Sequence, residues 1–304
     1  MSIVELPALL RRAVPALAVA LSCAGVAAPS AIAEPSPVCA HATSTTALPA
    51  AVAVLDWSEN LAFDRQGNLW VSRLYRNEVQ RYDDAGRLTA TVRVEFPGAV
   101  RLGPDGLMYA VYGDSPTSVV RPGGVVRFDP AAAEPRPEIF VSGFTMPNGA
   151  AFDADGTLYV ASATGVIRIG RDGVVDAGWT ERAELNANGI AVRDGTVYLT
   201  SNGGPLGRVL RFPVTEPEHR TVLADLTSAL PGVPDFADDL LVDDAGAVYV
   251  TTLSGQLVRI DPSGQSCQVL TAEPMTSVAA VPGRPGEFLA GTERGTILRI
   301  QLAP

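Results

Sequence analysis

Short hydrophobic segments alternate with polar turns along most of the chain, and four of them share one pattern. These are "ENLAFDRQGNLWVS" from Glu59, "NGAAFDADGTLYVAS" from Asn148, "NGIAVRDGTVYLTSN" from Asn188 and "DDLLVDDAGAVYVTT" from Asp238. Each has a short apolar strand, a polar turn ending in glycine, and a second strand of the form apolar-aromatic-apolar. Such alternation around a glycine turn predicts a β-hairpin, here repeated along the chain.

Two weaker copies raise the number of repeats to six. They begin at Gly98 and at Ser277, and a third strand such as "GVVRFD" or "QLVRID" follows each hairpin. The turn glycines lie 39 to 51 residues apart, at Gly67, Gly106, Gly156, Gly195, Gly246 and Gly286. This spacing is the length of a four-stranded propeller blade. The sequence therefore predicts an all-β fold, a six-bladed β-propeller of four-stranded antiparallel blades over residues 50–304.

The last repeat stops after its third strand, "TILRIQL", so its outer strand must come from elsewhere. The unassigned segment "AAVAVLD" predicts that an N-terminal strand at about residues 50–56 completes the last blade and closes the ring. The extension at 34–49 would then bring Cys39 near Cys267 on an outer strand. An even pair of cysteines in an exported chain indicates one disulfide, the alternative being two unrelated thiols.

The N-terminal residues differ from the rest of the chain. Arg11 and Arg12 precede an apolar run over 13–28 and a small-residue site at 31–33. This order is typical of a signal peptide covering 1–33, and it predicts a secreted or periplasmic protein. The apolar run is too short to anchor the mature chain, so we expect no membrane association after cleavage.

Composition narrows the function classes. All 23 basic residues are arginine, so lysine Schiff-base chemistry and a phosphate-loop lysine are excluded. The formal net charge of −10 disfavours nucleic acid and anionic membranes as partners. A small-molecule substrate and a monomeric protein are expected. The only histidines are His41 and His219, and neither falls on a predicted innermost strand.

The first residue of each innermost strand faces the mouth of a propeller's channel. Counting back from each turn gives the equivalent positions Glu59, Gly98, Asn148, Asn188, Asp238 and Ser277. An Asn-Gly pair alone could be a turn, but four oxygen-bearing side chains in one register indicate a metal site. An all-oxygen set fits Ca²⁺ best; Mg²⁺, Mn²⁺ and Zn²⁺ are alternatives, and Zn²⁺ is disfavoured because no Cys or His lies nearby.

The series Glu, Asn-Gly, Asn-Gly and Asp over blades one, three, four and five resembles the gluconolactonase and regucalcin superfamily. Diisopropyl fluorophosphatase and the paraoxonases are related to it. The resemblance implies a divalent-metal-dependent hydrolase, commonly a lactonase, with some members acting on organophosphates. It implies that Glu59, Asn148, Asn188 and Asp238 bind the metal. Asp238 and Glu59 would be the catalytic residues, with Asp238 acting as base or as nucleophile.

The chain departs from the family pattern near two of these positions. The usual Pro-Asp-Gly of blade five reads Ala237-Asp238-Asp239, which leaves open whether one or both aspartates touch the metal. Asn60 and Gly149 lie where a second, buried calcium would require carboxylates, so a second ion is not expected.

Residues at the mouth ends of the strands are candidates for substrate binding, the alternative being ordinary edge polar groups and packing aromatics. The candidates are Trp57, Arg73, Tyr75, Tyr112, Asp114, Ser162, Asn202, Thr252 and Glu293. Three other functions remain open. They are an organophosphate or aryl-ester hydrolase using the same site, a strictosidine-synthase-like enzyme, and a non-enzymatic secreted propeller whose Ca²⁺ is structural and whose rim binds a partner.

Overall fold

The protein is described here by a computed structural model that covers residues 39, 42–204, 206–227 and 235–303. The predicted signal peptide, His41 and part of the N-terminal extension lie outside the described residues. No helix within the described ranges is long and apolar enough to cross a membrane.

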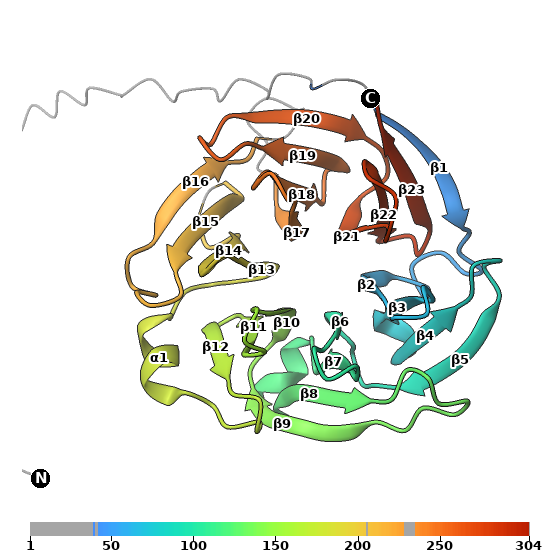
Figure 1. Ribbon diagram of the computed structural model, residues 1–304, viewed down its shortest axis with the longest axis horizontal. Helices are drawn as coiled ribbons and strands as arrows, with labels where there is room; N and C mark the ends of the chain where they lie inside the picture. The colour runs from blue at the N-terminus through green and yellow to red at the C-terminus, as the bar shows by residue number, and fades with distance from the viewer. Residues whose placement is uncertain (1–38, 40–41, 205, 228–234, 304) are drawn as a thin grey trace, which may run out of the picture. The chain divides into compact units, whose positions relative to one another are not determined.

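Antiparallel sheets follow one another along the chain and surround a central axis (Figure 1). Blade one contains β2 (Ser58–Phe63), β3 (Leu69–Arg73), β4 (Glu78–Tyr82) and β5 (Leu88–Arg93). Blade two contains β6 (Val100–Leu102), β7 (Met108–Tyr112), β8 (Gly123–Phe128) and β9 (Glu138–Phe144). Blade three contains β10 (Pro147–Phe152), β11 (Leu158–Ser162) and β12 (Gly165–Ile169).

Blade four contains β13 (Ile190–Arg193), β14 (Thr196–Ser201), β15 (Arg208–Pro213) and β16 (Thr221–Asp225). Blade five contains β17 (Ala237–Val242), β18 (Val248–Thr252), β19 (Gln256–Ile260) and β20 (Ser266–Thr271). Blade six contains β21 (Met275–Ala280), β22 (Glu287–Thr292), β23 (Ile297–Leu302) and β1 (Ala42–Leu48). The 3₁₀ turns η1 (Leu74–Arg76) and η2 (Pro116–Val119) and the helix α1 (Ala177–Arg182) complete the described elements. The predicted six-bladed β-propeller is confirmed.

The third blade differs from the predicted four-stranded form. Its sheet has three strands, and α1 lies at the outer position (Figure 1). The Asp176 side chain caps the helix by accepting from the Trp179 N–H at 3.0 Å. The residue after the helix also pairs with the outer edge of β12: the Val166 N–H donates to the Ala183 carbonyl at 3.1 Å. A capped helix therefore replaces the fourth strand and satisfies an edge donor.

Closure of the ring by an N-terminal strand is confirmed, but the predicted segment is wrong. The closing strand is β1, whose Ala42 pairs with Leu302 of β23, so the propeller begins at residue 42 rather than 50. Residues 51–56 fold on themselves, because the Asp56 carboxylate accepts from the N–H groups of Ala51 and Val52, both at 2.7 Å. The threonine-rich β1 suits an exposed outer strand better than the apolar segment at 50–56.

Cys39 and Cys267 lie at disulfide-bonding distance, as the sequence predicted. Their Cα atoms are 5.2 Å apart, and the Cys39 N–H donates to the Gln268 carbonyl at 2.8 Å. This contact ties the residues before β1 to the outer strand of blade five.

The aromatic residues of the second strands pack between blades, as predicted. Trp70 of blade one lies 5.1 Å from Phe128 of blade two, and Tyr249 of blade five lies 4.8 Å from Phe288 of blade six. The polar end of the Trp70 ring donates to Asp64, whose other oxygen accepts two backbone N–H groups of the hairpin turn. Turn and core therefore fix each other, which holds the innermost strands in place.

Candidate functional site

The strands that begin at the channel mouth are irregular where the predicted ligands lie. The register of β2 shifts between Ser58 and Asn60, that of β10 between Pro147 and Ala150, and that of β17 between Ala237 and Leu240. A bulge leaves a residue out of the ladder and re-aims its side chain. Glu59, Asn148 and Asp238 fall within these bulges.

Backbone contacts between neighbouring blades explain the two Asn-Gly pairs. The Gly149 N–H donates to the Asn188 carbonyl at 3.0 Å, and the Gly189 N–H donates to the Asp238 carbonyl at 3.1 Å. A Cβ atom at Gly149 would lie 2.4 Å from the Asn188 oxygen, and one at Gly189 would lie 2.5 Å from the Asp238 oxygen. Only glycine therefore fits at positions 149 and 189. The two hydrogen bonds fix the backbone of Asn188 and of Asp238, the ligand positions in the following blades.

Glu59 is held by two neighbours. The Trp57 Nε1–H donates to Glu59 Oε2 at 2.6 Å, and Asn148 Nδ2 donates to Glu59 Oε1 at 2.8 Å. The same Asn148 nitrogen donates to Asp114 Oδ2, also at 2.8 Å. The structure thus joins residues from blades one, two and three. A half-turn of the Asn148 amide would exchange its nitrogen for its oxygen and offer a ligand atom.

The mouth concentrates negative charge. Burial raises the pKa of Glu59, although the Trp57 and Asn148 hydrogen bonds oppose the rise. Burial, followed by repulsion from Glu59, raises the pKa of Asp114 well above its usual value. Asp238 has its pKa raised well above normal by burial and then by repulsion from Glu59 and other carboxylates, Glu293 among them. A bound cation would relieve this repulsion.

Asn188 offers an oxygen atom for a cation. Its Oδ1 is buried and has no hydrogen-bond partner among the described residues. A buried, unsatisfied carbonyl oxygen is costly, and a hard cation would satisfy it. No group of three or more His, Cys, Asp or Glu side chains meets metal-site geometry in the part of the chain that the structure describes. A metal at the mouth would therefore depend on the carboxamide oxygens together with Glu59 and Asp238.

Asp239 makes different contacts from Asp238. Asn60 Nδ2 donates to Asp239 Oδ2 at 2.9 Å, and an Arg101 nitrogen lies 3.4 Å from the same oxygen. Burial raises the pKa of Asp239, while the charge of Arg101 opposes the rise. Sequence reasoning missed this network. Its one available signal was a charged residue, Arg101, in a strand that lines the channel.

Four of the predicted substrate residues lie near the ligand set. Trp57 and Asp114 share hydrogen bonds with it, and the Glu293 charge acts on Asp238. Tyr75 packs edge-on against Trp57, with ring centroids 5.6 Å apart. These four residues stay in the candidate site.

The other five predicted substrate residues have structural contacts. Buried Arg73 donates to the carbonyls of Asp56 and Gly295, each at 2.7 Å. The Asn202 side chain donates to the Ala237 carbonyl and accepts from the Ala237 N–H, and so holds the first residue of β17. The remaining contacts are Ser162 with the Gly165 carbonyl, Thr252 with the Gln256 N–H, and Tyr112 with Ser142. We leave all five out of the proposed site. His219 is exposed and pairs with Glu216 at 2.7 Å, away from the innermost strands.

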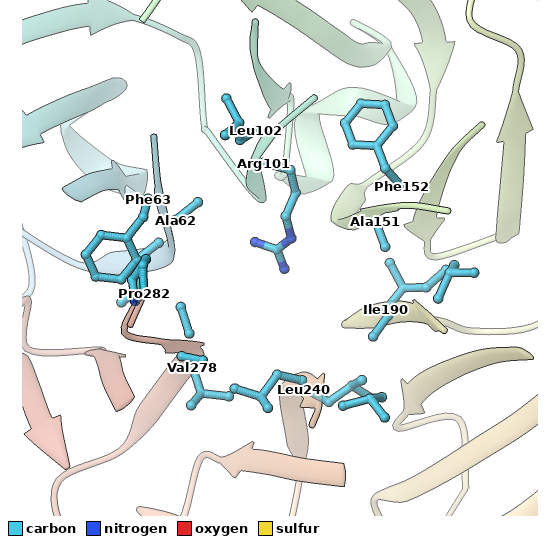
Figure 2. Close-up of a pocket in the computed structure, with 17 residues that line it drawn as sticks. Ala62, Phe63, Arg101, Leu102, Ala151, Phe152, Ile190, Leu240, Val278 and Pro282 are labelled. Carbon is cyan, nitrogen blue, oxygen red and sulfur yellow. The ribbon is translucent and has the colours of Figure 1, made fainter. Parts of the chain in front are cut away.

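The far half of the channel is a cavity of about 410 Å³. Its walls are the later residues of the innermost strands, including Leu61, Ile190 and Leu240, and the Arg101 side chain extends into its centre (Figure 2). The predicted ligands lie at the opposite ends of these strands.

Comparisons with known proteins support the fold at low sequence identity. No protein-family model and no curated protein matches the chain. Among solved structures, a gluconolactonase from Xanthomonas campestris is 17% identical, with 90% of this chain and 98% of that chain covered and a TM-score of 0.64. A calcium-binding protein, regucalcin, from Agrobacterium tumefaciens is 15% identical, covering 84% and 94%, with a TM-score of 0.62.

An enzyme of another class is as similar. The aldose sugar dehydrogenase of Streptomyces coelicolor, bound to PQQ, is 15% identical, covers 88% of this chain and all of that chain (100%), and has a TM-score of 0.66. The structural neighbours thus include gluconolactonase and regucalcin, as the resemblance predicted. Because they also include a dehydrogenase, the choice of chemistry depends on the residues of the site.

Proposed function

We propose that the protein is a divalent-metal-dependent hydrolase that acts on a lactone or a related ester, with Ca²⁺ as its preferred ion. One observation carries the proposal. Glu59 and Asp238, carboxylates with raised pKa values, share the channel mouth with the buried, unsatisfied oxygen of Asn188. The gluconolactonase and regucalcin neighbours support the same reading.

Glu59, Asn148, Asn188 and Asp238 would hold the ion. The donor set fits a hard cation, because it contains carboxylate and carboxamide oxygens only. A bound divalent ion would polarise the carbonyl group of the ester and stabilise negative charge developing on its oxygen.

The chain's own residues prepare the site. Trp57 orients the Glu59 carboxylate through its hydrogen bond at 2.6 Å, and Asn148 adds a bond at 2.8 Å as long as its amide is not turned towards an ion. The Gly189 N–H donates to the Asp238 carbonyl and so fixes the backbone that carries this carboxylate. As base, Asp238 would take the proton of the attacking water. As nucleophile, its carboxylate would bond to the carbonyl carbon and displace the alcohol group of the ester, and water would then hydrolyse the acyl-aspartate.

Apolar side chains beside the mouth favour a substrate with an apolar part next to its ester group. Tyr75 is 45% exposed and Phe236 is 42% exposed. Tyr75 follows β3 and Phe236 directly precedes β17, so both lie at the mouth ends of their blades. Together with Trp57 they would shield the reacting carbonyl from water.

The test is a panel of lactones, aryl esters and phosphotriesters, assayed after EDTA treatment and again after Ca²⁺ is added. We expect lactone hydrolysis that EDTA abolishes and Ca²⁺ restores. Preference for phosphotriesters would move the assignment to an organophosphate hydrolase. A Ca²⁺-dependent rise in melting temperature without turnover of any ester would support the non-enzymatic propeller instead.

Export is part of the proposal and rests on the pattern of residues 1–33. N-terminal sequencing of protein recovered outside the cytoplasm tests it. The expected first residue is Glu34, and an intact Met1 would contradict cleavage.

A further inference from the structure

Arg101 is the one charged side chain among the described residues that line the far cavity. The other lining residues are all apolar, and the guanidinium extends from β6 into the middle of the channel (Figure 2). A charge in such surroundings is costly unless it is paired, so its contacts should reveal its purpose.

The guanidinium contacts three neighbours. Its NH1 group donates to Asn60 Oδ1 and, at 2.9 Å, to the Val100 carbonyl, while its NH2 group lies 3.4 Å from Asp239 Oδ2. Asn60 Nδ2 also donates to Asp239 Oδ2 at 2.9 Å. Asn60 and Asp239 are each only 3% exposed. The three side chains thus form a closed group below the mouth.

The oxygens of this group are suited to a cation. Asp239 Oδ1 is buried without a hydrogen-bond partner among the described residues, although Arg101 is present. Carboxylate and carboxamide oxygens are the donors that Ca²⁺ takes. An arginine cannot lose its proton under ordinary conditions, and it is tethered to the chain, so it supplies a permanent positive charge at this point.

We propose that Arg101 is a built-in cation that neutralises Asp239, fills the place of a second ion and limits the channel to one divalent ion, at the mouth. In this arrangement Asp238 is a ligand of that ion and Asp239 is not. The ion at the mouth belongs to the proposed function, whereas the pairing of Arg101 with Asp239 does not depend on it.

The main experiment counts bound Ca²⁺ per chain by equilibrium dialysis. We expect one ion for the wild-type protein and two for Arg101→Met, because methionine keeps the apolar stem and removes the charge. The melting temperature of Arg101→Met should fall in EDTA, and Ca²⁺ should raise it by more than it raises the wild type. Arg193→Met is the matched control, since Arg193 pairs with exposed aspartates, and it should bind one ion.

Two further variants keep the proposal falsifiable if Arg101→Met does not fold. Asp239→Asn should still bind one ion, and Arg101→Met/Asp239→Asn should return the count to one. Loss of all binding in Asp239→Asn would make Asp239 a ligand and overturn the proposal.

The outcomes separate this inference from the proposed function. A wild-type protein that already binds two ions, or an Arg101→Met variant that binds no more than the wild type, overturns the role of Arg101 and leaves the hydrolase intact. A wild-type protein that binds none, with one ion gained in Arg101→Met, supports the role of Arg101 and removes the metal site at the mouth.

Discussion

The two ends of the central channel are built from the same six innermost strands and have opposite chemistry. On β2, Glu59 carries a carboxylate at the mouth, while Leu61, two residues on, lines the apolar cavity. On β17 the same change separates Asp238 from Leu240. Strand pairing is regular at the apolar end, whereas the bulges lie at the polar end. Breaks in a regular pattern thus coincide with the candidate site.

The two ends also differ in energetic terms. Buried carboxylates at the mouth repel one another and keep an unsatisfied amide oxygen beside them. Residues such as Leu240 have left water almost completely and stabilise the fold. Substitutions at the mouth should therefore change metal binding and turnover while sparing stability, and substitutions at the far end should do the reverse.

Asp238→Ala should give the largest effect. We expect Ca²⁺-dependent hydrolysis to fall by about 10²- to 10⁴-fold, the usual contribution of a general base. The melting temperature in EDTA should not fall, because the substitution removes one of several buried carboxylates that repel one another. Steady-state kinetics and thermal melting test this, with the exposed Asp244→Ala as control. Full activity in Asp238→Ala would remove the residue from the mechanism.

Leu240→Ala should break the far end alone. The side chain is 2% exposed, so its truncation should lower the free energy of unfolding by about 2–5 kcal/mol. Urea denaturation measures this loss, and calorimetric titration should find an unchanged Ca²⁺ affinity. A large change in affinity would mean that the two ends are coupled, contrary to the comparison.

Replacing both cysteines tests a region remote from either end. Cys39→Ser/Cys267→Ser should lower the free energy of unfolding by about 2–4 kcal/mol, because the unfolded chain gains freedom. Turnover at a temperature where the variant is folded should match the wild type. Reducing agent should destabilise the wild-type protein similarly and leave the variant unaffected.

Asn148→Ala should have the smallest effect. We expect Ca²⁺ affinity to fall on the order of 10-fold, since the oxygen ligand proposed for the turned amide is lost. Stability should change little. Asn202→Ala is the matched control. It removes two hydrogen bonds to the Ala237 backbone and should lower stability more than it lowers Ca²⁺ affinity. If Asn148→Ala unfolds the protein, the residue is structural.

The sequence predicted what repeats and missed what occurs once. Glycine spacing indicated the six blades, and the shared register placed Glu59, Asn148 and Asp238 at the starts of innermost strands. Outer strands face water and carry little hydrophobic pattern, so the sequence predicts the closing strand at 50–56 instead of at β1 and does not predict α1.

Contacts within the site were equally hidden. The pairing of Arg101 with Asp239 joins two blades that are distant in sequence, and no local pattern reports such a contact. The hydrogen bond from Asn148 to Asp114 depends on the loop after β7, and hydrophobic periodicity does not predict the path of a loop.

The pairing of β1 with β23 joins the two ends of the described propeller, and this has a consequence for how the protein folds. Hairpins within a blade close short loops and can form early. The contact between Ala42 and Leu302 closes a loop that contains every other blade. Its entropy cost is compensated only after the intervening blades have formed. We expect blade six to be completed last, by a slow step that refolding kinetics would detect as delayed protection of the β1 amides from hydrogen exchange.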